Sequence, residues 1–238
     1  MPNVYQQIAG SLKYAAQLRP GLMFCVSQLS RVMNCPTQEN LSLVRQVIKY
    51  IISLLDLKIY YSPHDPNDPL CETHNQLMIF TDSDWSTFVD TRCSLGCYVI
   101  MFAGAAIVHR SKSHKSVIFS SAVAEFYEAT EGCRELAYIR GILKDFYDAE
   151  CPSTTTYIDN QACIAMAKMP VFSEKQKHIP TRVCHLRKCC SNKKVELRLV
   201  STRFEVVDIG TKALPEPAFV MFRNVLLGIT TFSKLQGM

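Results

Sequence analysis

Two aspartates in this chain of 238 residues stand where a strand of an α/β sheet is expected to end. The apolar run 77–81 leads directly into Asp82, and the run 154–158 leads into Asp159. The carboxyl ends of strands are the usual place for sites in α/β sheets. If the two predicted strands are neighbours, these carboxylates face each other.

Two further acids stand among apolar residues. Glu125 lies one turn into a predicted long helix, and Asp208 follows Val206 and Val207. An unpaired carboxylate is costly to bury, and a metal ion removes that cost. Taken singly, each acid is more often a helix cap, a turn residue or a surface charge. Together they fit a site for two divalent cations about 4 Å apart, which hydrolyses phosphodiesters. The candidate catalytic and metal-binding residues are Asp82, Glu125, Asp159 and Asp208.

The pattern of apolar residues after position 76 is typical of an α/β domain with a mixed sheet. The predicted order is three strands (77–82, 96–102 and 105–110), a long helix (122–147), a strand (154–159), a helix (161–168), a fifth strand (195–200) and a closing helix that starts near residue 205. The long helix has the clearest pattern, because its apolar residues keep steps of three and four throughout.

The first 61 residues have a different pattern. We expect helices over 5–18, 22–33 and 38–55, then a short strand over 57–61. Residues 62–76 are rich in proline, asparagine and aspartate, which favours turns and predicts a linker. The predicted organisation is therefore a helical segment (1–61), a linker (62–76), an α/β domain (77–228) and a tail (229–238).

Composition places the chain among ordinary globular proteins, with 48% hydrophobic and 20% charged residues. We expect no membrane span, because its longest apolar stretches are far below about 20 residues. The amino terminus lacks a secretory pattern, so we expect an intracellular protein. The 11 cysteines have irregular spacing, which favours reduced thiols over disulfides and argues against a structural zinc site.

Positive charge is concentrated between residues 175 and 203, where nine Lys or Arg residues stand against one acid, Glu196. This density suits contacts with phosphates, although a solvated face would have the same composition. The candidate nucleic-acid-binding residues are Lys175, Lys177, His178, Arg182, His185, Arg187 and Lys188.

Motifs in register make the chain resemble the ribonuclease H region of copia-type retrotransposon polyproteins. The segments that carry the resemblance are 81–85 (TDSDW), 120–126 (SSAVAEF), 159–161 (DNQ), 177–179 (KHI) with His185 and Arg187, and 207–214 (VDIGTKAL). The segments 10–14 (GSLKY), 19–21 (RPG), 29–33 (LSRVM) and 36–37 (PT) are similar to the connection that joins reverse transcriptase to ribonuclease H in that family.

The resemblance implies a ribonuclease-H-like fold, two Mg²⁺ or Mn²⁺ ions held by the four acids, and an RNA·DNA hybrid as substrate. It makes residues 1–61 the end of a reverse transcriptase region, whose remaining portion is then an expected partner. It also implies action in the cytoplasm, within a virus-like particle, or in the nucleus. The chain contains no polymerase, protease or integrase motif, so we do not expect it to copy nucleic acid alone. His178 and His185 are either ordinary hydrogen-bonded histidines or, if functional, are expected from the surrounding Lys and Arg residues to hold phosphate or help product release.

Three departures from the family pattern leave alternatives open. Val123 stands where the helix motif carries an extra acid, Gly21 where the connection has an aspartate, and Pro180 where an acid is common. The chain is therefore either a metal-dependent endoribonuclease, or an inactive remnant that only binds nucleic acid, or a product whose exposed apolar helices make it aggregate.

Overall fold

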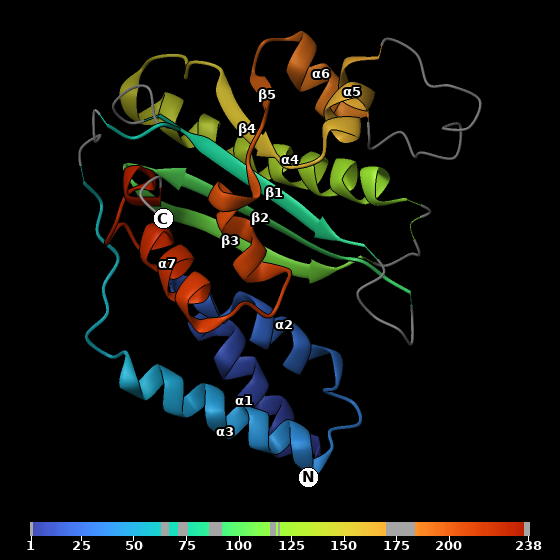
Figure 1. Ribbon diagram of the computed structural model, residues 1–238, viewed down its shortest axis with the longest axis vertical. Helices are drawn as coiled ribbons and strands as arrows, with labels where there is room; N and C mark the ends of the chain where they lie inside the picture. The colour runs from blue at the N-terminus through green and yellow to red at the C-terminus, as the bar shows by residue number, and fades with distance from the viewer. Residues whose placement is uncertain are drawn as a thin grey trace.

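The computed structural model describes residues 2–62, 67–70, 76–85, 92–114, 118, 120–169 and 184–235. Its centre is a five-stranded sheet in the order β3-β2-β1-β4-β5 (Figure 1). The strands are β1 (Met78–Asp84), β2 (Leu95–Phe102), β3 (Ala105–Ser113), β4 (Thr154–Ile158) and β5 (Val195–Leu199). The first three strands pair antiparallel, and β4 and β5 continue the sheet parallel to β1. The predicted mixed five-stranded sheet is thereby confirmed.

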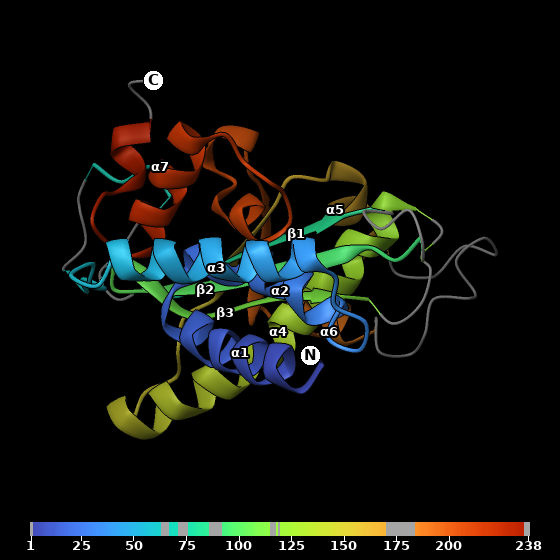
Figure 2. The same ribbon diagram turned by 90° about the horizontal axis from the view of Figure 1, so that it is seen from below.

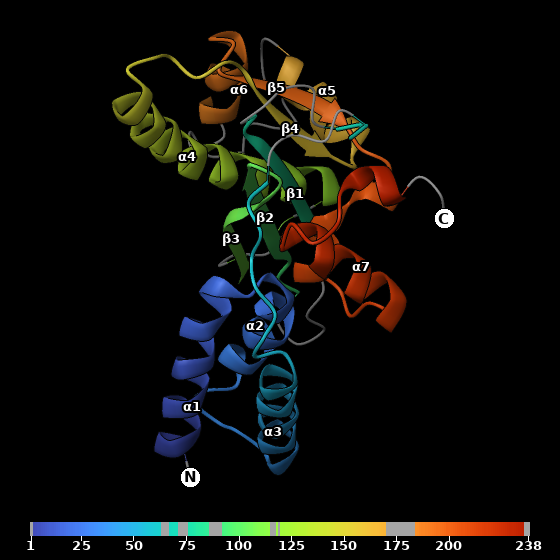
Figure 3. The ribbon, with the colours of Figure 1, turned by 90° about the vertical axis from the view of Figure 1, so that its left-hand side faces the viewer.

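Helices cover both faces of the sheet, which is why β1 is buried on both sides. On one face lie α4 (Ser121–Tyr147), α5 (Gln161–Lys168) and α6 (Cys184–Ser191), and on the other lies α7 (Glu216–Leu226) (Figure 3). Ile79 packs with Phe126 of α4, whereas the next residue, Phe80, packs with Phe222 of α7. Side chains alternate along a strand, so β1 contributes to two separate cores.

The long helix α4 has defined ends. The Ser120 side chain accepts a hydrogen bond from the backbone N–H of Val123 at 3.3 Å, which satisfies a donor of the first turn. At the other end Asp148 has a φ of 48°, the left-handed conformation that commonly terminates helices. The amino-terminal cap fixes Glu125 in the second turn, beside the carboxyl end of β1.

The amino-terminal helices form a third core beside the edge strand β3. They are α1 (Pro2–Ala15), α2 (Met23–Arg31) and α3 (Gln38–Ser53), and they lie together beneath the sheet (Figures 1 and 2). Fully buried Tyr5 lies in their shared core, and its hydroxyl donates to the carbonyl of Leu29 at 3.0 Å. A contact of 2.7 Å between Nε2 of His109 and the carbonyl of Ala16 ties them to β3.

Residues 57–61 do not form the predicted strand. The segment is extended, but its backbone bonds connect different elements: the Tyr60 N–H donates to the Leu227 carbonyl at 2.8 Å, and the Ser62 N–H donates to Ala103 at 3.0 Å. These two backbone bonds therefore connect the end of α7 with the β2–β3 turn. Such long-range pairing cannot be read from a local pattern.

The closing segment also differs from the prediction. No α-helix starts near residue 205; short 3-10 helices span Thr202–Phe204 and Val206–Gly210, and α7 begins at Glu216. Pro215 contributes to this outcome, because a proline disfavours helical backbone in the residue before it. Between the predicted helix 161–168 and the predicted strand 195–200, where no element was predicted, residues 184–191 form α6.

The predicted domain boundaries remain predictions. Within the predicted tail, Phe232 and Leu235 are buried in the core that contains Phe80. Phe80 and Phe232 stack with ring centroids 5.4 Å apart. Across the described ranges, no helix combines the length and the apolar character that crossing a bilayer requires.

Candidate active site

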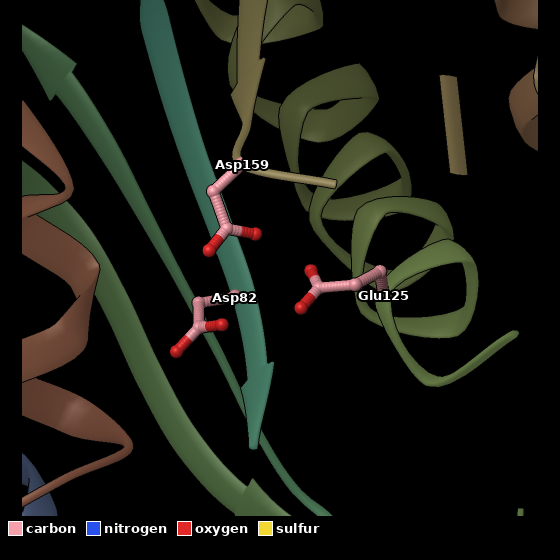
Figure 4. Close-up of side chains that lie close together, drawn as sticks. All are labelled: Asp82, Glu125 and Asp159. Atoms are coloured by element: carbon pink, nitrogen blue, oxygen red, sulfur yellow. The ribbon is translucent and has the colours of Figure 1, made fainter. Parts of the chain in front are cut away.

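Strand register brings two of the predicted carboxylates together. Thr81 of β1 is the parallel partner of Ile158 of β4, so the residues that follow them, Asp82 and Asp159, lie side by side. The Ser83 N–H, in the same strand end, donates to Oε1 of Glu125 at 3.1 Å and holds that side chain toward the sheet. One carboxylate oxygen from each of Asp82, Glu125 and Asp159 lies within 4.8 Å of the other two (Figure 4).

Crowding of these groups changes their protonation. Burial raises the pKa of Glu125 to about 10, helped by the negative charges of Asp82 and Asp159. Burial and Asp82 also raise the pKa of Asp159. Among the described atoms, Oε2 of Glu125 has no hydrogen-bond partner. Hard oxygen ligands, mutual repulsion and a buried orphan oxygen are the properties of a site for a divalent cation, so these residues fit one.

Asp208 lies at the same centre but is not one of the three grouped carboxylates. Its Oδ1 accepts from Nζ of Lys212 at 2.7 Å, and the same ammonium lies 3.6 Å from Oδ2 of Asp82. Thr211 Oγ1 also donates to Oδ2 of Asp82. Burial and the charge of Asp82 raise the pKa of Asp208 to about 6, although Lys212 opposes this shift. The carboxylates in turn raise the pKa of Lys212 against the effect of burial.

A fifth acid, Glu205, escaped the sequence analysis. Its side chain is fully buried, and neither of its carboxylate oxygens has a partner among the described atoms. Burial raises its pKa well above the usual value, and the charge of Asp82 contributes next. The signal in the sequence was an acid beside Val206 and Val207, the same signal that singled out Asp208.

The carboxylates open onto a cleft of about 620 Å³. Asp84, Trp85 and Asn160 line it together with the three grouped acids and Lys212. Trp85 is held by a hydrogen bond of 2.8 Å from its indole N–H to the Ile118 carbonyl. The cleft is shallow and polar, a shape suited to an extended polymer rather than to an enclosed small molecule.

The predicted nucleic-acid-binding residues are only partly within the described chain. Lys175, Lys177, His178 and Arg182 lie outside the described residues. His185, Arg187 and Lys188 are on α6, where Lys188 is exposed. Arg187 donates to the Met166 carbonyl at 2.7 Å, and Nε2 of His185 lies 3.5 Å from Sγ of Cys189. Their assignment to nucleic acid stays a prediction.

Comparison with curated proteins gives a consistent result over most of the chain. It is 27% identical over 229 residues, 96% of its length, to the retrovirus-related Pol polyprotein from transposon RE1 of Arabidopsis thaliana. It is 28% identical to the polyprotein from transposon RE2 of the same plant and 26% identical to that from transposon TNT 1-94 of Nicotiana tabacum, covering 93% of this chain in each case. The chain spans 15–16% of the length of these relatives.

Comparison with solved structures finds ribonuclease H domains at low similarity. The N-terminal RNase H domain of a Mycobacterium tuberculosis protein aligns with 62% of this chain and 96% of its own, with a TM-score of 0.43 and 8% identity. LC11-RNase H1, in a complex with an RNA/DNA hybrid, aligns with 53% of this chain and 86% of its own, with a TM-score of 0.35 and 13% identity. No protein-family model matches the chain. The polyprotein relatives nevertheless confirm that this chain resembles the copia-type retrotransposon Pol polyproteins along nearly its whole length.

Proposed function

We propose that the chain is the ribonuclease H portion of a retrotransposon polyprotein and cleaves the RNA strand of RNA·DNA hybrids. The observation that carries the proposal is the meeting of Asp82, Glu125 and Asp159, from three separate elements, within 4.8 Å. The relatives are retrovirus-related Pol polyproteins of transposons, and the resemblance of the motifs to the ribonuclease H region of such polyproteins implies an RNA·DNA hybrid as substrate. We also propose that the chain acts with the reverse transcriptase portion of its parent polyprotein, in a virus-like particle or in the nucleus.

In the proposed reaction Asp82, Glu125, Asp159 and Asp208 hold two Mg²⁺ or Mn²⁺ ions. Bound there, the ions would supply an activated water and stabilise the charge that develops on the phosphate. The chain's own contribution is placement. The β1–β4 register sets Asp82 beside Asp159, and the Ser83 N–H orients Glu125 toward them.

The position of Lys212 bears on whether the chain is catalytically active. Its ammonium lies between Asp82 and Asp208, where it partly neutralises the cluster without a metal. This observation favours a second candidate function, an inactive remnant that keeps its fold and its nucleic-acid surface but no longer cuts. The two candidates differ in whether divalent ions compete successfully with Lys212.

Cleavage of a labelled RNA·DNA hybrid by the purified chain, with Mg²⁺, Mn²⁺ or a chelator, tests the proposal. We expect cleavage that requires metal and falls by more than about 100-fold in Asp159→Asn, since loss of even an outer-shell partner costs 10- to 100-fold. The exposed Asp56→Asn is the matched control and should cleave normally. A folded protein that binds the hybrid and never cuts it is the inactive remnant.

A further inference from the structure

A second depression lies between the amino-terminal helices and the sheet. It is a groove of about 500 Å³ bounded by α1, α2 and the edge strand β3. Figure 2 shows these helices beneath the strand. Because β3 is the last strand of the sheet on this side, the groove runs along an edge that the described strands leave unpaired. We call it the β3-edge groove.

The β3-edge groove is positively charged. Lys13 of α1, Arg31 at the end of α2 and Lys112 of β3 line it, and no Asp or Glu is among the described residues that do so. Arg110 also lines it but is committed elsewhere, since its guanidinium lies 3.5 Å from Glu128. Lys13 and Lys112 are exposed and have no carboxylate partner among the described ion pairs.

Hydroxyl groups line the groove together with these cations. Ser27 and Ser30 of α2 and Ser113 of β3 are all half-buried, and the Ser30 hydroxyl donates to the Val26 carbonyl at 2.7 Å. Lysine and arginine interspersed with serine is the lining that proteins use for backbone phosphates of nucleic acid, with the hydroxyls fixing the register of the strand.

Strand register places the β3-edge groove at a fixed distance from the carboxylate cluster. Ser83 is paired with Gly96, and Gly96 is paired with Lys112, so Lys112 lies two strands away from the residue next to Asp82. Neighbouring strands are about 4.8 Å apart, which makes this separation about 10 Å. The grooves of B-form DNA are about 6 to 12 Å wide, so this separation is comparable with the distance across one groove of a duplex.

We infer that the β3-edge groove binds the phosphodiester backbone of the nucleic-acid duplex whose other strand lies at the carboxylate cluster. Lys13 and Lys112 contact phosphates, and the hydroxyls of Ser27 and Ser113 hold the nucleic-acid strand in place. The helices α1 and α2 are therefore part of the substrate surface. The inference rests on the proposed function only in naming that duplex an RNA·DNA hybrid.

Binding of a labelled RNA·DNA hybrid in chelator, measured over about 50 to 200 mM salt, tests the inference. Each phosphate contact contributes about 0.9 to the slope of log affinity against log salt. The double variant Lys13→Gln and Lys112→Gln should therefore have a slope shallower by about 2. The matched double variant Lys49→Gln and Lys58→Gln removes two exposed lysines outside the groove and should keep the wild-type slope.

The outcomes separate this inference from the proposed function. An unchanged slope in the groove variant overturns the inference even where the wild type cleaves hybrid. If the groove variant has a shallower slope and the wild type never cleaves hybrid, the inference about the groove is supported and the proposed activity is ruled out. A polyglutamate peptide serves as a competitor: if it displaces the hybrid as well as unlabelled hybrid of equal charge does, the groove is a site for acidic protein and the inference fails.

Discussion

The ammonium of Lys212 lies 2.7 Å from Oδ1 of Asp208 and 3.6 Å from Oδ2 of Asp82. The two residues Asp208 and Lys212 are four apart in sequence, on the segment that follows the last strand, whereas Asp82 comes from the centre of the sheet. A single cation of the chain thus joins the closing segment to β1. In the metal-free protein this ammonium partly neutralises the carboxylates, as a divalent ion would.

Replacing Lys212 by glutamine should destabilise the metal-free protein. Removing one partner of a buried ion pair costs about 3–5 kcal/mol, but the Lys212 side chain is 38% exposed, so screening reduces the expected loss in unfolding free energy to about 1 kcal/mol. Mg²⁺ should restore most of it. Urea unfolding with chelator and with Mg²⁺ measures both, and Lys58→Gln is the exposed control. A Lys212→Gln protein as stable in chelator as the wild type would show that Lys212 does not neutralise the cluster.

Binding of Mg²⁺ should release a proton near neutral pH. Burial and the neighbouring aspartates raise the pKa of Glu125 to about 10, so this carboxyl is protonated in the metal-free protein at pH 7.5. A ligand must be deprotonated, so affinity should rise between about pH 6 and pH 10, by up to about tenfold per pH unit. Calorimetry in buffers of different ionisation enthalpy counts the protons. Glu125→Gln should abolish the release and exposed Glu196→Gln should not; equal heats in all buffers would contradict the assignment.

Replacing Glu205 by glutamine should stabilise the protein progressively as pH rises. Burial holds the pKa of Glu205 well above its usual value of 4.5, so the folded state keeps the proton that the unfolded chain loses above pH 4.5. The wild type therefore loses stability as pH rises through this window, by at most about 1.4 kcal/mol per pH unit, and Glu205→Gln does not. Unfolding free energies at pH 5 and at pH 8, with Asp56→Asn as control, measure the difference. The same advantage at both pH values would mean that Glu205 does not titrate in this way.

The sequence predicted the elements of the sheet and three of the carboxylates that meet because both depend on local patterns. Apolar runs ending in an aspartate marked β1 and β4, and steps of three and four marked α4 around Glu125. Convergence in space then followed from one long-range register, Thr81 with Ile158, which sequence alone could only suggest.

The features that the sequence did not predict depend on long-range packing. Glu205 lies between two short 3-10 helices, and its burial follows from contact with the sheet and not from its own periodicity. Residues 57–61 have the alternation of a strand, but Tyr60 bonds to Leu227 and the next residue after the segment, Ser62, bonds to Ala103, on a different element. Lys212 belonged to a recognised motif, yet its position between Asp82 and Asp208 became evident only from the folded chain.

The contact between Tyr60 and the end of α7 leads to a prediction about the fold. Gly228 has a φ of 68°, and a Cβ added there would lie 1.9 Å from the Tyr60 carbonyl oxygen. Gly228→Ala therefore pushes the backbone of Tyr60 away from the end of α7 and places an alanine in the left-handed region, which strains it. We expect the unfolding free energy to fall by more than about 2 kcal/mol. Gly141→Ala is the matched control: it lies within α4, nothing lies within 4 Å of its added Cβ, and helix propensity should stabilise it by about 0.5–1 kcal/mol. Thermal unfolding of both variants measures the contrast. If Gly228→Ala is as stable as the wild type, residues 57–62 are not anchored to α7 through Tyr60. This segment can then be displaced without destabilising the sheet.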